Sequence, residues 1–151
     1  MRNTTIDNIA DYFLYRYREC GECLTNLKLQ KLVYYSQAWY LANKKKPLFN
    51  GKFEAWIHGP VNYKLYKRFK KYKWRPITHD VDLPKLPPKI VGFLDEIINA
   101  YGDETAYSLE RMTHHERPWA EARRDLEPDE SSSKVISEEV MKEYYGSRIN
   151  N

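Results

Sequence analysis

Two cysteines lie close together near the N-terminus, in the stretch Cys20-Gly21-Glu22-Cys23. A redox pair with this spacing needs thiols of low pKa, which are found at the N-terminus of a helix. Here the pair follows a predicted helix, where the negative end of the helix dipole disfavours a thiolate. A structural zinc site would need a second C-x-x-C, and these are the 2 cysteines of the chain. We therefore predict that the pair is inert.

The 4 histidines are His58, His79, His114 and His115. Three of them, all but His79, could in principle complete a metal site with the cysteines, but no ligand spacing indicates one. The sequence has no H-E-x-x-H motif, no nucleophile elbow and no glycine-rich phosphate loop. His58 precedes Gly-Pro, so it either fixes a turn through a hydrogen bond or contacts a ligand or partner. We therefore predict a protein that is not an enzyme, with no catalytic residue, no metal and no cofactor.

Residues 64–75, KLYKRFKKYKWR, hold seven cations interleaved with aromatic side chains. Such a stretch can bind a nucleic-acid backbone, with Tyr66 or Trp74 stacking on bases, or can contact an acidic protein. In the alternative interpretation, the cations are the solvated side of a helix whose apolar residues face the core. Those apolar residues are Leu65, Phe69 and Tyr72. Because the net charge is only +4, we rank nucleic-acid binding second, behind binding of a protein partner.

Length and composition are typical of a globular protein. The chain has 151 residues, the usual size of one domain, so we expect a single domain over residues 1–151. Charged residues make up 30% and apolar residues 42%, as in ordinary folded proteins. No segment approaches the length of a membrane span and the start does not resemble a signal peptide, so we expect a cytoplasmic protein without membrane contact.

The element that must position most of these residues is a helix over about 26–43. Its apolar residues surround most of the helix, which predicts a central, largely buried position. Gln30 and Gln37 share one face, and we expect their buried amides to bond neighbouring backbone. Lys28 and Lys31 share another face.

A short β-hairpin is predicted after this helix. Asn50-Gly51 lies between short apolar runs and is a strong local signal for the hairpin turn. Apolar and polar side chains alternate over 53–58, as in a strand with one buried face. We expect Gly59-Pro60 to end that strand, with Pro60 as the first residue of a helix over about 61–73.

Other helices are expected after an N-cap at Thr4 or Thr5 as far as a stop at Gly21, over about 88–101, from about Glu104 and after Ser137. One more turn is expected to start at Pro118 and to point Trp119 inward. The predicted fold class is therefore mainly α, a compact helical domain around a buried central helix with a small β-hairpin.

Three ordered motifs resemble those of the SocA-like antitoxin family, also called the Panacea domain and often described as phage-associated protein. The first is TNLKLQKLVYYSQ over 25–37, the second is AWIHGPV over 55–61, and the third is LERMTHHERPWAEAR over 109–123. The similarity covers nearly the whole chain. We assign a structural role to the following motif residues: Gln30, Gln37, Gly59, Pro60, His114 and Trp119.

The resemblance implies an antitoxin of a toxin–antitoxin system that binds and neutralises a cognate toxin protein, often encoded in a prophage. It also implies that a member can act as an adaptor to an ATP-dependent protease. The family brings no catalytic residues with it. If the hairpin packs beside the central helix, one patch can contact the toxin, and we predict its residues to be Lys28, Lys31, Tyr35, Trp56 and His58.

Overall fold

The computed structural model describes residues 4–149, as seven α-helices, one 3-10 turn and a two-stranded sheet. In chain order the elements are α1 (Ile6–Glu19), α2 (Asn26–Lys44), β1 (Glu54–Trp56), β2 (Gly59–Val61), α3 (Tyr63–Phe69), η1 (Lys70–Tyr72), α4 (Pro88–Tyr101), α5 (Ala106–His114), α6 (Arg117–Ala122) and α7 (Glu138–Gly146). The mainly α prediction is confirmed.

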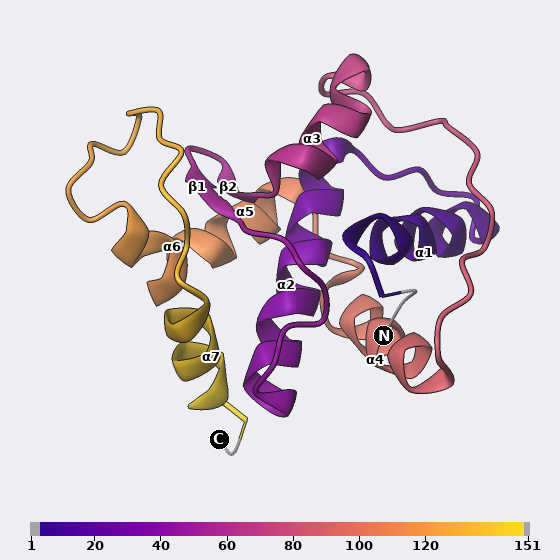
Figure 1. Cartoon of the computed structure of the whole chain (residues 1–151). Helices are drawn as coiled ribbons and strands as arrows, with labels where there is room; N and C mark the ends of the chain where they lie inside the picture. Colours follow the sequence, from indigo (N-terminus) through magenta and orange to yellow (C-terminus); the bar gives the residue numbers. More distant parts are fainter. Residues whose placement is uncertain (1–3, 150–151) are drawn as a thin grey trace.

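Helix α2 runs through the middle of the molecule, with α1 and α4 on one side and α6 and α7 on the other (Figure 1). It begins after Thr25, whose hydroxyl accepts a hydrogen bond from the Lys28 amide at 3.1 Å. Its hydrophobic residues are distributed around the helix, and nearly all of them are buried, as the sequence predicts. A helix without a polar face can only be stable when neighbours cover every side.

The other predicted helices also form near the expected residues. Thr5 caps α1 through a bond from the Asn8 amide, and Gly21 follows its end with φ of +76°. Ser137 caps α7, and Ile136 and Met141 are both buried beside the cap. Local capping signals therefore locate these helix ends correctly.

The hairpin forms at a different place from the predicted one. Strands β1 and β2 pair antiparallel with Ala55 opposite Pro60 and Trp56 opposite Gly59, so the turn is Ile57-His58. The prediction of a turn at Asn50-Gly51 is wrong. The prediction that Gly59-Pro60 ends the strand is wrong too, because both residues belong to β2.

Side chains from elsewhere use the hydrogen-bonding groups that an Asn50-Gly51 hairpin would have needed. The Gln37 amide donates to the Phe49 carbonyl and accepts from the Leu48 amide, at 2.8 and 2.7 Å. The free edge of β1 is used by a distant segment, because the Ala55 amide donates to the Lys134 carbonyl at 2.8 Å. Long-range partners therefore override the local turn signal.

Helix α3 starts later than predicted. Asn62 is its N-cap and accepts from the Leu65 amide at 2.9 Å, so Pro60 is not the first helical residue. Leu65 and Phe69 face the core, which confirms two of the three inward residues predicted for the basic stretch. The third, Tyr72, is partly buried against the same core.

Candidate functional site

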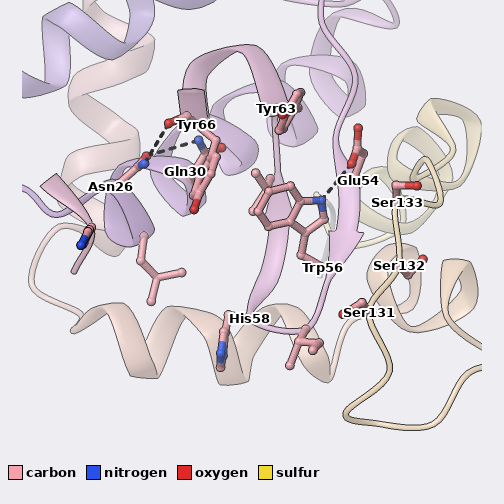
Figure 2. A pocket seen from close by; sticks show the side chains of 14 residues that line it. Asn26, Gln30, Glu54, Trp56, His58, Tyr63, Tyr66, Ser131, Ser132 and Ser133 are labelled. Carbon is pink, nitrogen blue, oxygen red and sulfur yellow. Dashed lines mark hydrogen bonds between the residues drawn. The ribbon is translucent and has the colours of Figure 1, made fainter. Parts of the chain in front are cut away.

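An open groove of about 860 Å³ lies between the hairpin, the start of α2, α3 and the loop at 131–133. Figure 2 shows Trp56 in its centre, with Tyr63 and Tyr66 from α3 on one side and the loop serines on the other. Ile57 and His58, the turn of the hairpin, form one end. The surface is therefore built from segments that are up to about a hundred residues apart in the chain.

The three aromatic rings of the groove contact one another in fixed orientations. The Trp56 ring lies edge to face with Tyr66 at 4.9 Å between centroids, and Tyr63 stacks with Tyr66 at 6.5 Å. The Trp56 Nε1 donates to Glu54 Oε1 at 2.9 Å, which holds the indole in place. Tyr63 remains 46% exposed. Rigid aromatic side chains that keep exposed area are typical anchors of protein interfaces.

The amides at the base of the groove are used by the fold itself. Gln30 Oε1 accepts a hydrogen bond from the backbone N–H of Asn62 at 2.9 Å, and Gln30 Nε2 donates one to the backbone carbonyl of Asn62 at 3.4 Å. Asn26 Nδ2 donates to the Tyr66 carbonyl at 3.2 Å. The expected backbone bonding of Gln30 is therefore confirmed, and these amides position α3 against α2.

Lys31 is fully buried beneath the hairpin, with 0% exposure. Its Nζ donates to the Pro60 carbonyl at 3.3 Å, and burial lowers the pKa of the ammonium to about 7, although the nearby Glu110 charge opposes the shift. Gly59 lies directly above it with φ of +110°, and a Cβ at that position would be 2.5 Å from Lys31 Cε. The Gly-Pro motif and the lysine therefore pack as one unit.

The predicted patch of five contact residues does not form. Lys31 and Tyr35 are both buried, so neither side chain can touch a partner in this conformation. Lys28 does not line the groove, and its Nζ donates to the Gly102 carbonyl at 2.7 Å. The structure brings Trp56 and His58 together in the groove. The apolar pattern of α2 predicts a largely buried helix, and the structure shows that this burial includes Lys31 and Tyr35.

Tyr35 belongs to a buried network on the other side of α2. Its ring stacks on Tyr101 at 4.1 Å, and its hydroxyl donates to Glu116 Oε1 at 2.8 Å. The Tyr145 hydroxyl donates to the same oxygen at 2.8 Å, and burial raises the pKa of the Glu116 carboxyl. Glu116 is a structural residue that no pattern in the sequence identified.

The third motif supports the hairpin from behind. His114 stacks on Trp119 with centroids 3.9 Å apart, and the Trp119 Nε1 donates to the Trp56 carbonyl at 2.8 Å. Arg123, which sequence reasoning missed as a site residue, donates to the Ala55 carbonyl at 2.7 Å. The structural role expected of His114 and Trp119 therefore has a geometric basis: they set where the Trp56 backbone lies.

His58 lies on the exposed side of the same turn. Its Nδ1 is 3.1 Å from Glu110 Oε1, and 70% of the His58 side chain remains exposed. This contact ties the turn to α5 and leaves the rest of the ring open to a partner. Both roles considered for His58, turn fixing and partner contact, are compatible with this position.

The structure also places the two cysteines and the residues that could bind a metal ion. Cys20 and Cys23 are both exposed and unbridged. Among residues 4–149, no group of three or more histidine, cysteine, aspartate or glutamate side chains is placed to hold a metal ion. Within the same range, no helix has both the length and the apolar character that crossing a membrane requires.

Residues 29–120 match the family model described as Antitoxin SocA-like, Panacea domain. This match begins inside α2 and continues through the hairpin, α3, α4 and α5 to residue 120 within α6. The chain belongs to the SocA-like antitoxin family. The family assignment supports an antitoxin role and points to a regulatory, non-catalytic protein. The three motifs that suggested this family converge on the hairpin in space.

A curated relative of this SocA-like chain is Antitoxin SocA from Caulobacter vibrioides (strain NA1000 / CB15N), which is 48% identical over 46 residues. The aligned segment is 30% of this chain and 24% of the relative, so the chain spans about a quarter of that protein's length. No solved structure matches the chain significantly.

Proposed function

We propose that this domain neutralises a toxin protein by binding it at the groove around Trp56. Family membership supports the antitoxin role. The single observation that carries the location is that the family motifs build one rigid hairpin and leave its tryptophan beside two tyrosines at the surface. Aromatic side chains contribute much of the binding energy at protein interfaces. The encounter is expected in the cytoplasm, with a toxin encoded beside this chain.

A paired assay tests this function. The adjacent reading frame is expressed with or without this chain, and growth reports neutralisation. Trp56→Ala and Tyr66→Ala should weaken binding of the toxin by about 30-fold each, since truncating an anchor costs about 2 kcal/mol or more. The matched control is Tyr107→Ala, which removes an aromatic side chain that is 64% exposed on α5. Thermal melts of all variants separate loss of binding from loss of folding.

Lys31→Glu is a different kind of variant. Because Lys31 is completely buried, a glutamate there should unfold the domain and abolish rescue together with the melting transition. The proposal fails if the adjacent protein is not toxic or if every variant that loses rescue has also lost its fold.

Delivery of the toxin to an ATP-dependent protease is the finer part of the proposal. It rests on the family alone. Measuring the half-life of the toxin in cells with and without this chain separates masking from delivery, because masking leaves the half-life unchanged and delivery shortens it.

Nucleic-acid binding is the second candidate, and one observation favours it. Trp74 is 82% exposed and lies between Lys73 and Arg75, which are exposed too. Cations beside an aromatic ring can track a phosphate backbone and stack a base. Against it, Arg68 of the same stretch is paired internally with Asp7 and Asp11. Titrating labelled DNA and RNA at physiological salt tests it, because micromolar binding would reverse the ranking.

A further inference from the structure

We infer that the groove accepts a segment of the toxin in which a large apolar side chain is followed or preceded by acidic residues. The apolar side chain enters beside Trp56, and the acidic residues face the rim formed by α3 and η1. This inference rests on the proposed function and specifies the chemistry of the partner.

The rim formed by α3 and the residues after it is positively charged. Lys67 Nζ lies 4.9 Å from the centre of the Tyr63 ring, so this cation stands directly over a groove aromatic. Lys73 itself lines the groove. Both lysines are exposed, and neither forms an ion pair with any other residue in the described range 4–149. They are therefore available to carboxylates of a partner.

The opposite side of the groove carries a negative charge. Glu54 lines the groove, and its carboxylate is held there by the Trp56 indole. The serines that line this side, Ser131 to Ser133, carry no charge. A nucleic acid places phosphates along its whole length and would meet the Glu54 carboxylate, whereas a peptide can place its acidic residues on one side only. The charge arrangement therefore favours a protein segment.

Lys73 is held in a backbone conformation that is costly for any residue except glycine. Its φ is 55° and its ψ is −121°. Such conformations cost on the order of 1–3 kcal/mol for residues with a Cβ, and strain of this kind is concentrated at functional sites. A lysine at this position places a cation on the groove despite the strain, which supports a binding role for the charge.

The test uses the purified full chain and the protein encoded by the adjacent reading frame. Its dissociation constant is measured at about 50 mM and about 300 mM salt, because screening distinguishes charge from packing. The double reversal Lys67→Glu with Lys73→Glu should weaken binding by about 10-fold or more at low salt and by less at high salt. The control reversal Lys85→Glu with Lys89→Glu changes two exposed lysines outside the groove and should change binding less than about 2-fold.

Lys73→Gly gives an independent measurement. It removes the same cation and relieves the backbone, so the melting temperature should stay equal or rise while toxin binding weakens. A purely structural role for Lys73 would not separate these two readouts.

The outcomes separate the two proposals. If the wild-type chain does not bind the adjacent protein, the proposed function fails and this inference falls with it. If the wild type binds and the charge variants bind equally well, the inference is overturned and the antitoxin role stands. Tight binding of a labelled single-stranded DNA that is lost in the double reversal would also overturn it, since the rim would then be a nucleic-acid site.

Discussion

Replacing Gly59 with alanine should destabilise the domain strongly, for two reasons that the structure separates. The residue has φ of +110°, a conformation that residues with a Cβ rarely adopt. The added Cβ would also lie 2.5 Å from Lys31 Cε and 3.1 Å from Thr113 Oγ1. Lys31 is fully buried and bonded to Pro60, so moving its side chain aside would disturb the surrounding packing and this hydrogen bond.

The expected magnitude follows from adding the two effects. Backbone strain of this type costs about 1–3 kcal/mol, and overpacking a dense core costs about 1–3 kcal/mol. A total of about 4 kcal/mol corresponds to a loss of about 10 °C in melting temperature for a protein of this size. Urea unfolding followed by circular dichroism measures the free energy directly.

Two other glycines serve as matched controls. Gly21 has φ of +76° with nothing within 4 Å of the added Cβ, so Gly21→Ala should show strain alone, about 1 kcal/mol. Gly92 is inside α4 and has nothing within 4 Å and no positive φ, so alanine there should stabilise the protein by about 0.5–1 kcal/mol.

A double-mutant cycle isolates the contact with the lysine. Lys31→Ala removes the atom that the new Cβ would strike, so Gly59→Ala should cost about 1–3 kcal/mol less in that background than in the wild type. If Gly59→Ala costs no more than Gly21→Ala and shows no coupling to Lys31, then the hairpin does not pack on the lysine as described, and the reasoning is refuted.

Three further predictions concern buried charge and the cysteines. Burial lowers the pKa of Lys31 from its usual 10.5 to about 7 in the folded protein, so the unfolded state binds more protons between these two pH values. The free energy of unfolding, measured in urea, should therefore rise by about 2 kcal/mol from pH 7 to 9 relative to that of Lys31→Met. An identical pH dependence in both proteins would contradict the burial of Lys31. Glu116→Ala leaves the Tyr35 and Tyr145 hydroxyls without their shared acceptor and should cost about 2–4 kcal/mol, whereas Glu116→Gln, which keeps an oxygen acceptor, should cost about half as much in thermal melts. Cys20→Ser with Cys23→Ser should leave melting temperature and toxin binding nearly unchanged, and loss of a stoichiometric zinc with unfolding would sink this prediction.

Much of the helical fold could be predicted because helices are specified by neighbouring residues. Thr25 and Ser137 cap their helices through bonds to amides three residues away, which is a purely local arrangement. The apolar residues around α2 predicted its burial, and burial in turn required backbone partners for Gln30 and Gln37. These inferences need only the order of residues along the chain.

The candidate site depends on contacts between distant segments, which local patterns do not encode. The sequence alone determined the family motifs, the helices and the presence of a hairpin. Tertiary structure decided where the hairpin turns, because Gln37 and the segment at 134–136 take the hydrogen-bonding groups that Asn50-Gly51 would have used. It also decided that Lys31 is buried and Trp56 is accessible. Exposure depends on which elements pack over a side chain, and that is a property of the assembled fold.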